Sequence, residues 1–111
     1  MEIRRWTELL GVAYKRDVND IRESPALDLL VLLGRLGAQL SYSDPHVPKL
    51  SVEDRVLESQ PALAACAAAD CVVLVTDHSG FDYAAIAEHS RLIVDTRNAF
   101  RQFRRPHIIR L

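Results

Sequence analysis

The chain has 111 residues, the size of one domain, and because 49% of them are hydrophobic it can bury a core. It is short for an enzyme that must bind two substrates. Its net charge of −1 gives no general attraction to nucleic acid or to a membrane surface. No apolar run is long enough to span a bilayer, and residues 1–5 are not followed by the apolar segment of a signal peptide. We therefore expect a cytoplasmic protein with neither nucleic acid nor membrane as a partner.

The two cysteines point to no special chemistry. Cys66 and Cys71 lie five residues apart in an alanine-rich stretch, without CxxC spacing and without a neighbouring histidine. Buried, reduced thiols are therefore favoured over a disulfide or a metal site. We predict no metal centre in this chain.

The first part of the chain predicts a strand, a polar loop and a helix. Residues 1–8 are weakly patterned, and we place the domain at residues 9–111, with its first strand at 9–13. A helix is expected over residues 25–36, with Ser24 as its N-cap and Pro25 at its first position. Gly37 suits a left-handed C-terminal cap. The helix is apolar almost throughout, so we expect it to be covered on more than one side.

Three further strands, two further helices and a tail with a short terminal strand follow. Residues 38–43 alternate between apolar and polar positions and predict a strand near the sheet edge, whereas residues 49–60 look irregular, with a helical turn around 52–57. A short helix is expected over 61–70, a central buried strand over 71–75, a helix capped by Asp82 over 83–89, and a strand over 91–94. Residues 99–111 are basic and read as a solvated tail whose end adds a short strand.

Strands that alternate with helices imply a parallel sheet with helices on both faces. We therefore predict an α/β fold, a three-layer α/β/α arrangement with a Rossmann-like, mostly parallel sheet of about four to six strands. In such a sheet, ligands bind beyond the carboxyl ends of the strands. The predicted loops at that edge carry Lys15, Arg22 and Arg97, cations that can hold a phosphate group. From the residues alone, a solvated, purely connecting loop is the favoured interpretation of residues 11–25, because charged connecting loops are more common than ligand-binding loops.

Motifs for several common activities are missing. The chain has no GxGxxG, no GxxxxGK[ST] and no GxSxG, so the first loop cannot cradle a dinucleotide or triphosphate in the usual way. Asp77 and His78, beside Asp44 and Asp95, could form an acid–base pair, but aspartates at strand ends commonly cap loops and a lone histidine is usually structural. We predict no catalytic residue in this chain.

Four ordered segments nevertheless resemble one known family. Residues 10–26, 43–48, 69–78 and 93–98 resemble, in order, the motifs of the C-terminal domain of the UDP-glucose/GDP-mannose dehydrogenase family. The resemblance implies a nucleotide-sugar-binding domain of an NAD-dependent 6-dehydrogenase that oxidises a UDP-sugar, UDP-glucose or a UDP-N-acetylhexosamine, to the uronate in polysaccharide biosynthesis. It implies that Tyr14, Lys15 and Arg97 contact the UDP-sugar and that Arg22 faces the NAD cofactor.

The departures from the family pattern carry expectations of their own. The family's NAD-binding Rossmann domain, catalytic cysteine and dimer helix are not found in these residues, so NAD would be bound mainly by a domain absent from this chain. We therefore expect the chain alone to be inactive, with a homodimer or the missing N-terminal dehydrogenase domain as its protein partner. The first strand looks eroded. The alternative is a non-enzymatic dimerising or interaction module that uses the apolar helix 26–36.

Overall fold

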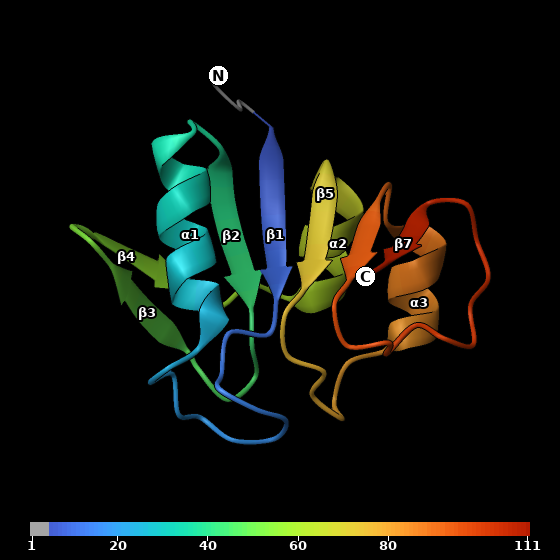
Figure 1. Ribbon diagram of the computed structural model, residues 1–111, viewed down its shortest axis with the longest axis horizontal. Helices are drawn as coiled ribbons and strands as arrows, with labels where there is room; N and C mark the ends of the chain where they lie inside the picture. The colour runs from blue at the N-terminus through green and yellow to red at the C-terminus, as the bar shows by residue number, and fades with distance from the viewer. Residues whose placement is uncertain (1–4) are drawn as a thin grey trace.

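A computed structural model describes residues 5–111, which form one five-stranded parallel sheet with a small hairpin beside it (Figure 1). The strands of the main sheet lie in the order β2-β1-β5-β6-β7, and β3 pairs antiparallel with β4. The predicted α/β class and the strand number are confirmed. The elements are β1 (Trp6–Leu10), α1 (Pro25–Arg35), β2 (Gln39–Ser43), β3 (Lys49–Val52), β4 (Arg55–Glu58), α2 (Ala62–Ala68), β5 (Cys71–Leu74), α3 (Tyr83–His89), β6 (Ile93–Asp95) and β7 (Ile108–Arg110).

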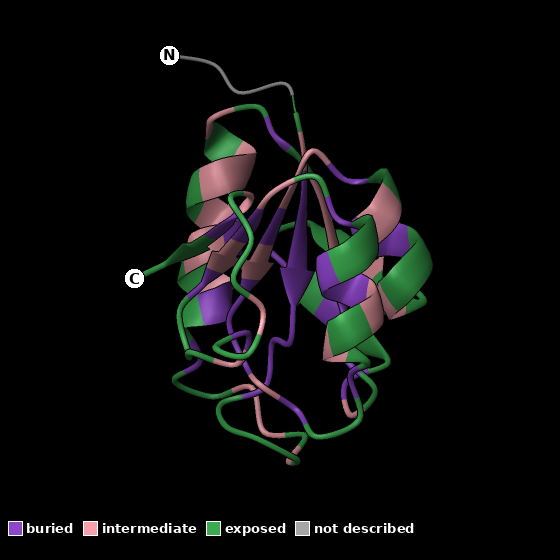
Figure 2. Ribbon diagram, turned by 90° about the vertical axis from the view of Figure 1, so that its right-hand side faces the viewer, coloured by how far each residue is buried: buried purple, intermediate pink, exposed green. Residues whose placement is uncertain are grey.

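Helices cover both faces of the sheet. Figure 2 shows α1 on one side of the strands and α2 with α3 on the other. Two separate clusters of buried side chains match these two faces: Leu30 of α1 packs in the cluster with Leu9 and Tyr42, whereas Ile86 of α3 packs in the other with Leu10. Because successive residues of a strand point to opposite faces, Leu9 and Leu10 of β1 serve the two cores.

The first strand lies three residues earlier than predicted. β1 begins at Trp6 and pairs along its length with β2, so it is complete rather than eroded. The predicted start was too late because the charged residue Glu8 interrupts the apolar run of the sequence. In the structure Glu8 is nevertheless fully buried in the sheet. The strand ends at Leu10. Val12 and Ala13, which were predicted to belong to the strand, lie in the loop that follows it. Of the weakly patterned segment 1–8, residues 1–4 lie outside the described residues.

Helix α1 begins and ends as the sequence indicates. Ser24 has an extended backbone and its Oγ accepts a hydrogen bond from the Ala26 N–H at 3.2 Å, while Gly37 has φ 88°. Less of the surface of α1 is covered by other elements than the sequence led us to expect. The helix packs on the sheet and on β3, but Leu32 remains 56% exposed.

The predicted irregular segment 49–60 is instead the β3–β4 hairpin. Leu50 and Val52 point into the core while Lys49 and Ser51 are exposed, an alternation typical of a strand. The expectation of a helical turn around 52–57 was wrong. The turn places Glu53 at φ 55°, a left-handed conformation for which its sequence gives no signal.

The later elements agree with the predictions except in the tail. β5 is the middle strand of the sheet, Asp82 accepts a hydrogen bond from the Ala85 N–H, and a short strand, β7, does close the chain. The tail before it is not simply solvated, since Phe100 is fully buried. Among the described residues, no helix is both long and apolar enough to cross a membrane.

Candidate functional site

Four loops leave the carboxyl ends of β1, β2, β5 and β6 and gather at one edge of the sheet, at the bottom of Figure 1. The β1–α1 loop, residues 11–24, passes very close to the β5 loop at Gly11. A Cβ built on Gly11 would lie 2.3 Å from the Thr76 carbonyl oxygen, and the φ of Gly11 is 83°. Only glycine satisfies both conditions without displacing the neighbouring backbone.

Asp44, at the end of β2, anchors the start of the β1–α1 loop. Its Oδ2 accepts hydrogen bonds from the Val12 N–H at 2.8 Å and the Ala13 N–H at 3.0 Å. The same oxygen lies 2.8 Å from His78 Nε2, and both side chains are fully buried. The carboxylate thus joins three neighbouring strand ends, which explains why a charged residue is buried here.

The β5–α3 loop holds the far part of the same segment. Asp17 donates its backbone N–H to His78 Nδ1 at 2.8 Å and accepts from the Ser79 N–H at 2.9 Å and the Ser79 Oγ–H at 2.6 Å. The Ser79 hydrogen bonds lower the pKa of the Asp17 carboxyl. Arg16 forms an ion pair with Asp77. The β1–α1 loop is therefore clamped along its length.

Both ring nitrogens of His78 have hydrogen-bond partners. Nδ1 accepts a backbone N–H, so in the neutral ring Nε2 carries the proton and donates it to Asp44. Ligand atoms of Asp17, His46 and His78 lie within 4.8 Å of one another, a spacing compatible with a metal ion. Because Nδ1 is already satisfied by Asp17, the geometry favours the structural role for His78 that the sequence indicated.

Tyr14 and Lys15 lie where the clamped loop is open to solvent. Tyr14 is 44% exposed, and its backbone N–H donates to the Asp20 carbonyl, which folds the loop back on itself. Lys15 is exposed and forms no hydrogen bond or ion pair with any of residues 5–111. Its ammonium group is thus available to a ligand at the mouth of the loop.

Arg22 shares a small cavity of about 230 Å³ with Tyr14, Asp20 and Glu23. Its guanidinium already pairs with Asp20, at 2.9 Å between Nη2 and Oδ2, and this contact lowers the pKa of the Asp20 carboxyl to about 2. The predicted role of Arg22 toward a cofactor stays a prediction, and a ligand there would have to compete with Asp20.

Arg97 lies in another cavity and does not share the one with Tyr14. Its Nε donates to the Val75 carbonyl at 3.0 Å. It lines a largely apolar groove of about 500 Å³ between α1 and the sheet; the lining residues are Pro25, Asp28, Leu29, Leu32, Val73, Val75, Thr96 and Arg97. Asp95 caps this turn by accepting the backbone N–H groups of Arg97, Ala99 and Phe100.

Neither cysteine is activated as a nucleophile, because burial raises the pKa of both thiols. Cys66 and Cys71 are free thiols, and burial raises the pKa of Cys66 to about 12, so it stays protonated near neutral pH. Asp44 and Asp95 are both occupied as caps of backbone N–H groups.

The chain resembles known proteins over most of its length. Residues 8–102 match the UDP binding domain of the UDP-glucose/GDP-mannose dehydrogenase family. The chain is 34% identical over 90 residues to the NDP-N-acetyl-D-galactosaminuronic acid dehydrogenase of Ralstonia nicotianae, a match that covers 78% of this chain and 21% of the relative. It is 31% identical over 104 residues to the UDP-glucose 6-dehydrogenase of Bacillus subtilis, covering 86% of this chain and 23% of the relative.

Solved structures of dehydrogenases contain a region with the same fold as this chain. A UDP-N-acetyl-mannosamine dehydrogenase from Staphylococcus aureus superposes with a TM-score of 0.71 at 27% identity, over 96% of this chain and 26% of that one. A UDP-glucose dehydrogenase from Pyrobaculum islandicum, at 23% identity, shares the fold with a TM-score of 0.73, over 98% of this chain and 25% of that one. The chain thus spans about a quarter or less of the length of these relatives.

Proposed function

Since the chain belongs to the UDP-glucose/GDP-mannose dehydrogenase family, whose UDP binding domain it matches, we propose that it binds the diphosphate and base of a UDP-sugar through Tyr14 and Lys15, and that Arg97, which lies in a separate cavity, contacts the UDP-sugar of a second subunit. The observation that carries the proposal is the clamped β1–α1 loop, which presents Lys15 without any protein partner among residues 5–111. A loop held at both ends loses little further entropy when a ligand binds, and a free ammonium group attracts a diphosphate.

The names of the relatives support a proposal for the substrate class. Their names cover UDP-glucose and N-acetylhexosamine nucleotides, and the chain resembles both kinds at about 30% identity. We propose that the complete enzyme oxidises such a sugar with NAD and that this domain supplies the nucleotide-binding half of the cleft. Arg22 would then face the cofactor. The two free cysteines agree with a reducing compartment, the cytoplasm.

We further propose that the chain alone does not oxidise a UDP-sugar, because catalysis requires nucleophile, cofactor and substrate to be held together. An assay of NADH formation with UDP-glucose and UDP-N-acetylhexosamines tests this directly. Sustained turnover by the isolated chain would refute it.

Binding is tested separately from activity. Calorimetric titration with UDP and UDP-sugars should give saturable binding, and Lys15→Gln should weaken it by about tenfold, the value of one charge-assisted hydrogen bond. Lys49→Gln is the matched control, since Lys49 is an exposed lysine of the hairpin, 3.9 Å from Glu58. Equal binding by the wild type and Lys15→Gln would contradict the assignment of Lys15.

A second candidate function rests on the apolar groove beside α1. Leu32 is 56% exposed and lies at the rim of the groove, which suits an interaction module that pairs through this helix. The mass of the chain in solution discriminates between the two roles. A dimer that Leu32→Lys converts to a monomer favours the interaction module, whereas a concentration-independent monomer excludes pairing of this chain with itself.

A further inference from the structure

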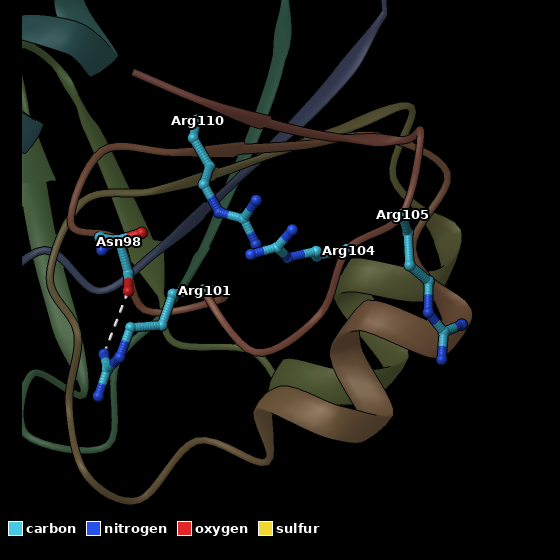
Figure 3. A pocket seen from close by; sticks show the side chains of 5 residues that line it. All are labelled: Asn98, Arg101, Arg104, Arg105 and Arg110. Atoms are coloured by element: carbon cyan, nitrogen blue, oxygen red, sulfur yellow. Dashed lines mark hydrogen bonds between the residues drawn. The ribbon is translucent and has the colours of Figure 1, made fainter.

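A strongly basic pocket lies beside the C-terminal strand and shares no lining residue with the cavities of Tyr14, Arg22 and Arg97. We call it the arginine pocket. It has a volume of about 450 Å³ and is lined by Asn98, Arg101, Arg104, Arg105 and Arg110 (Figure 3). The lining side chains come from the segment after β6 and from β7 itself.

The charge of this pocket is not balanced by the chain. Five of the 14 basic residues fall within residues 97–110, and no Asp or Glu follows Asp95 in the sequence. Within residues 5–111, the ion pair made by a lining arginine is that of Arg105 with Glu88, at 3.1 Å. These arginines are exposed to solvent, and a cluster of charge of one sign raises the local concentration of anions around it.

Two of the arginines form its centre. Arg110 Nη2 donates to the carbonyl oxygens of Phe100 and Phe103, the latter at 3.0 Å, so its guanidinium is fixed in place. Figure 3 shows the Arg104 guanidinium extending toward that of Arg110, while Arg105 points away from them. Arg104 makes no hydrogen bond or ion pair with residues 5–111. Its donors are therefore free to meet an anion.

The turn that holds Arg110 is rigid because Phe100 is fully buried. Its ring contacts Tyr83 edge to face at 5.2 Å between centroids, and Phe103 lies 6.3 Å from Phe100 on the other side. The two carbonyl groups that hold Arg110 belong to this packed turn. The position of the Arg110 donors is thus set before any ligand arrives, which lowers the entropic cost of binding.

We propose that the arginine pocket is a binding site for a small phosphoryl anion of the diphosphate class. Guanidinium groups match phosphate oxygens in a two-point fashion, and two facing guanidiniums can divide the oxygens of a diphosphate between them. The lining consists of polar and charged side chains without an aromatic ring for a base to stack on, so the phosphoryl group is what the pocket recognises. This site shares no residue with the proposed UDP-sugar site and does not depend on it.

The test uses the whole chain and inorganic diphosphate as the probe. Amide chemical shifts should change in a saturable manner around residues 98–110 at constant ionic strength. Arg104→Gln should weaken binding about tenfold. The matched control is Arg55→Gln, an exposed arginine of the β4 strand that makes no ion pair within residues 5–111. Binding that Arg104→Gln leaves unchanged, or shifts that spread evenly over all basic residues, would overturn the proposal.

A second arm identifies the source of the diphosphate and separates the two sites. If UDP competes with diphosphate at residues 98–110 and Arg104→Gln weakens both, the site accepts a nucleotide-borne diphosphate; if only the inorganic ion binds there, the site takes the free ion. Shift changes confined to residues 14–22 and abolished by Lys15→Gln would overturn the arginine pocket while leaving the proposed function intact.

Discussion

Replacement of Glu8 by glutamine should make the protein more stable above neutral pH. Glu8 is fully buried in the middle of the sheet, where Ser41 Oγ–H donates to its Oε1 at 2.7 Å and the Ser43 hydroxyl donates to Oε2. Burial raises the pKa of this carboxyl from 4.5 to about 7, and the two serine hydrogen bonds offset only part of that effect. A glutamine reproduces the protonated acid in shape and hydrogen bonding.

The sign and size of the effect follow from proton linkage. Between pH 4.5 and 7 the folded protein keeps the Glu8 proton that the unfolded chain has lost, so the free energy of unfolding of the wild type falls as pH rises through this window. A shift of this size corresponds to roughly 3 kcal/mol. Glu8→Gln does not titrate, so it should match the wild type near pH 4 and exceed it by up to about 3 kcal/mol at pH 8.

Urea unfolding followed by circular dichroism at a series of pH values measures this difference. All other titratable groups are present in both proteins, so their contribution cancels in the comparison. Glu58→Gln, at an exposed position of β4, is the control and should show no such pH-dependent gain. A wild-type-to-Glu8→Gln difference that does not change between pH 4 and 8 would refute the reasoning.

Three further substitutions test the packing around the loop edge. Gly11→Ala should cost at least about 3 kcal/mol of unfolding free energy, because its Cβ would meet the Thr76 carbonyl oxygen, whereas Gly80→Ala, with no atom within 4 Å, should be nearly neutral in the same urea assay. Ser24→Ala should cost about 1–2 kcal/mol through loss of the α1 cap, and Ser24→Thr should keep most of it; equal losses would show that the hydroxyl is not the cause. Phe100→Ala should cost about 3–5 kcal/mol and Phe100→Leu much less; a neutral Phe100→Ala would mean that the tail is solvated after all.

The sequence predicts this fold well where one physical signal dominates. Helix α1 has a cap, a proline and a glycine at its ends, and β5 is a continuous apolar run, so both were located correctly. The errors occur where a polar residue is buried or a turn lacks its usual residues. Glu8 interrupts the apolar pattern at the start of β1, although it is buried. Glu53 has a left-handed conformation that is normally adopted by glycine or asparagine.

The candidate site could be predicted only in part. The sequence indicates which charged residues follow the strands, and the structure confirms that the β1–α1, β2–β3, β5–α3 and β6–β7 loops meet at one edge. It cannot indicate that Asp44 and His78, 34 residues apart, share a buried hydrogen bond, because that pairing depends on β1 lying between β2 and β5. Nor does it show that Arg97 lies in a different cavity from Tyr14 and Arg22.

The buried Glu8 also gives the protein a built-in optical reporter. The chain has a single tryptophan, Trp6, and its indole Nε1–H donates to Ser41 Oγ at 2.6 Å, the same hydroxyl that donates to Glu8. A change in the charge of Glu8 is therefore transmitted through one hydroxyl to the one indole of the chain. Tryptophan emission should follow the protonation of the sheet interior near pH 7 in the folded protein, without any label or added dye.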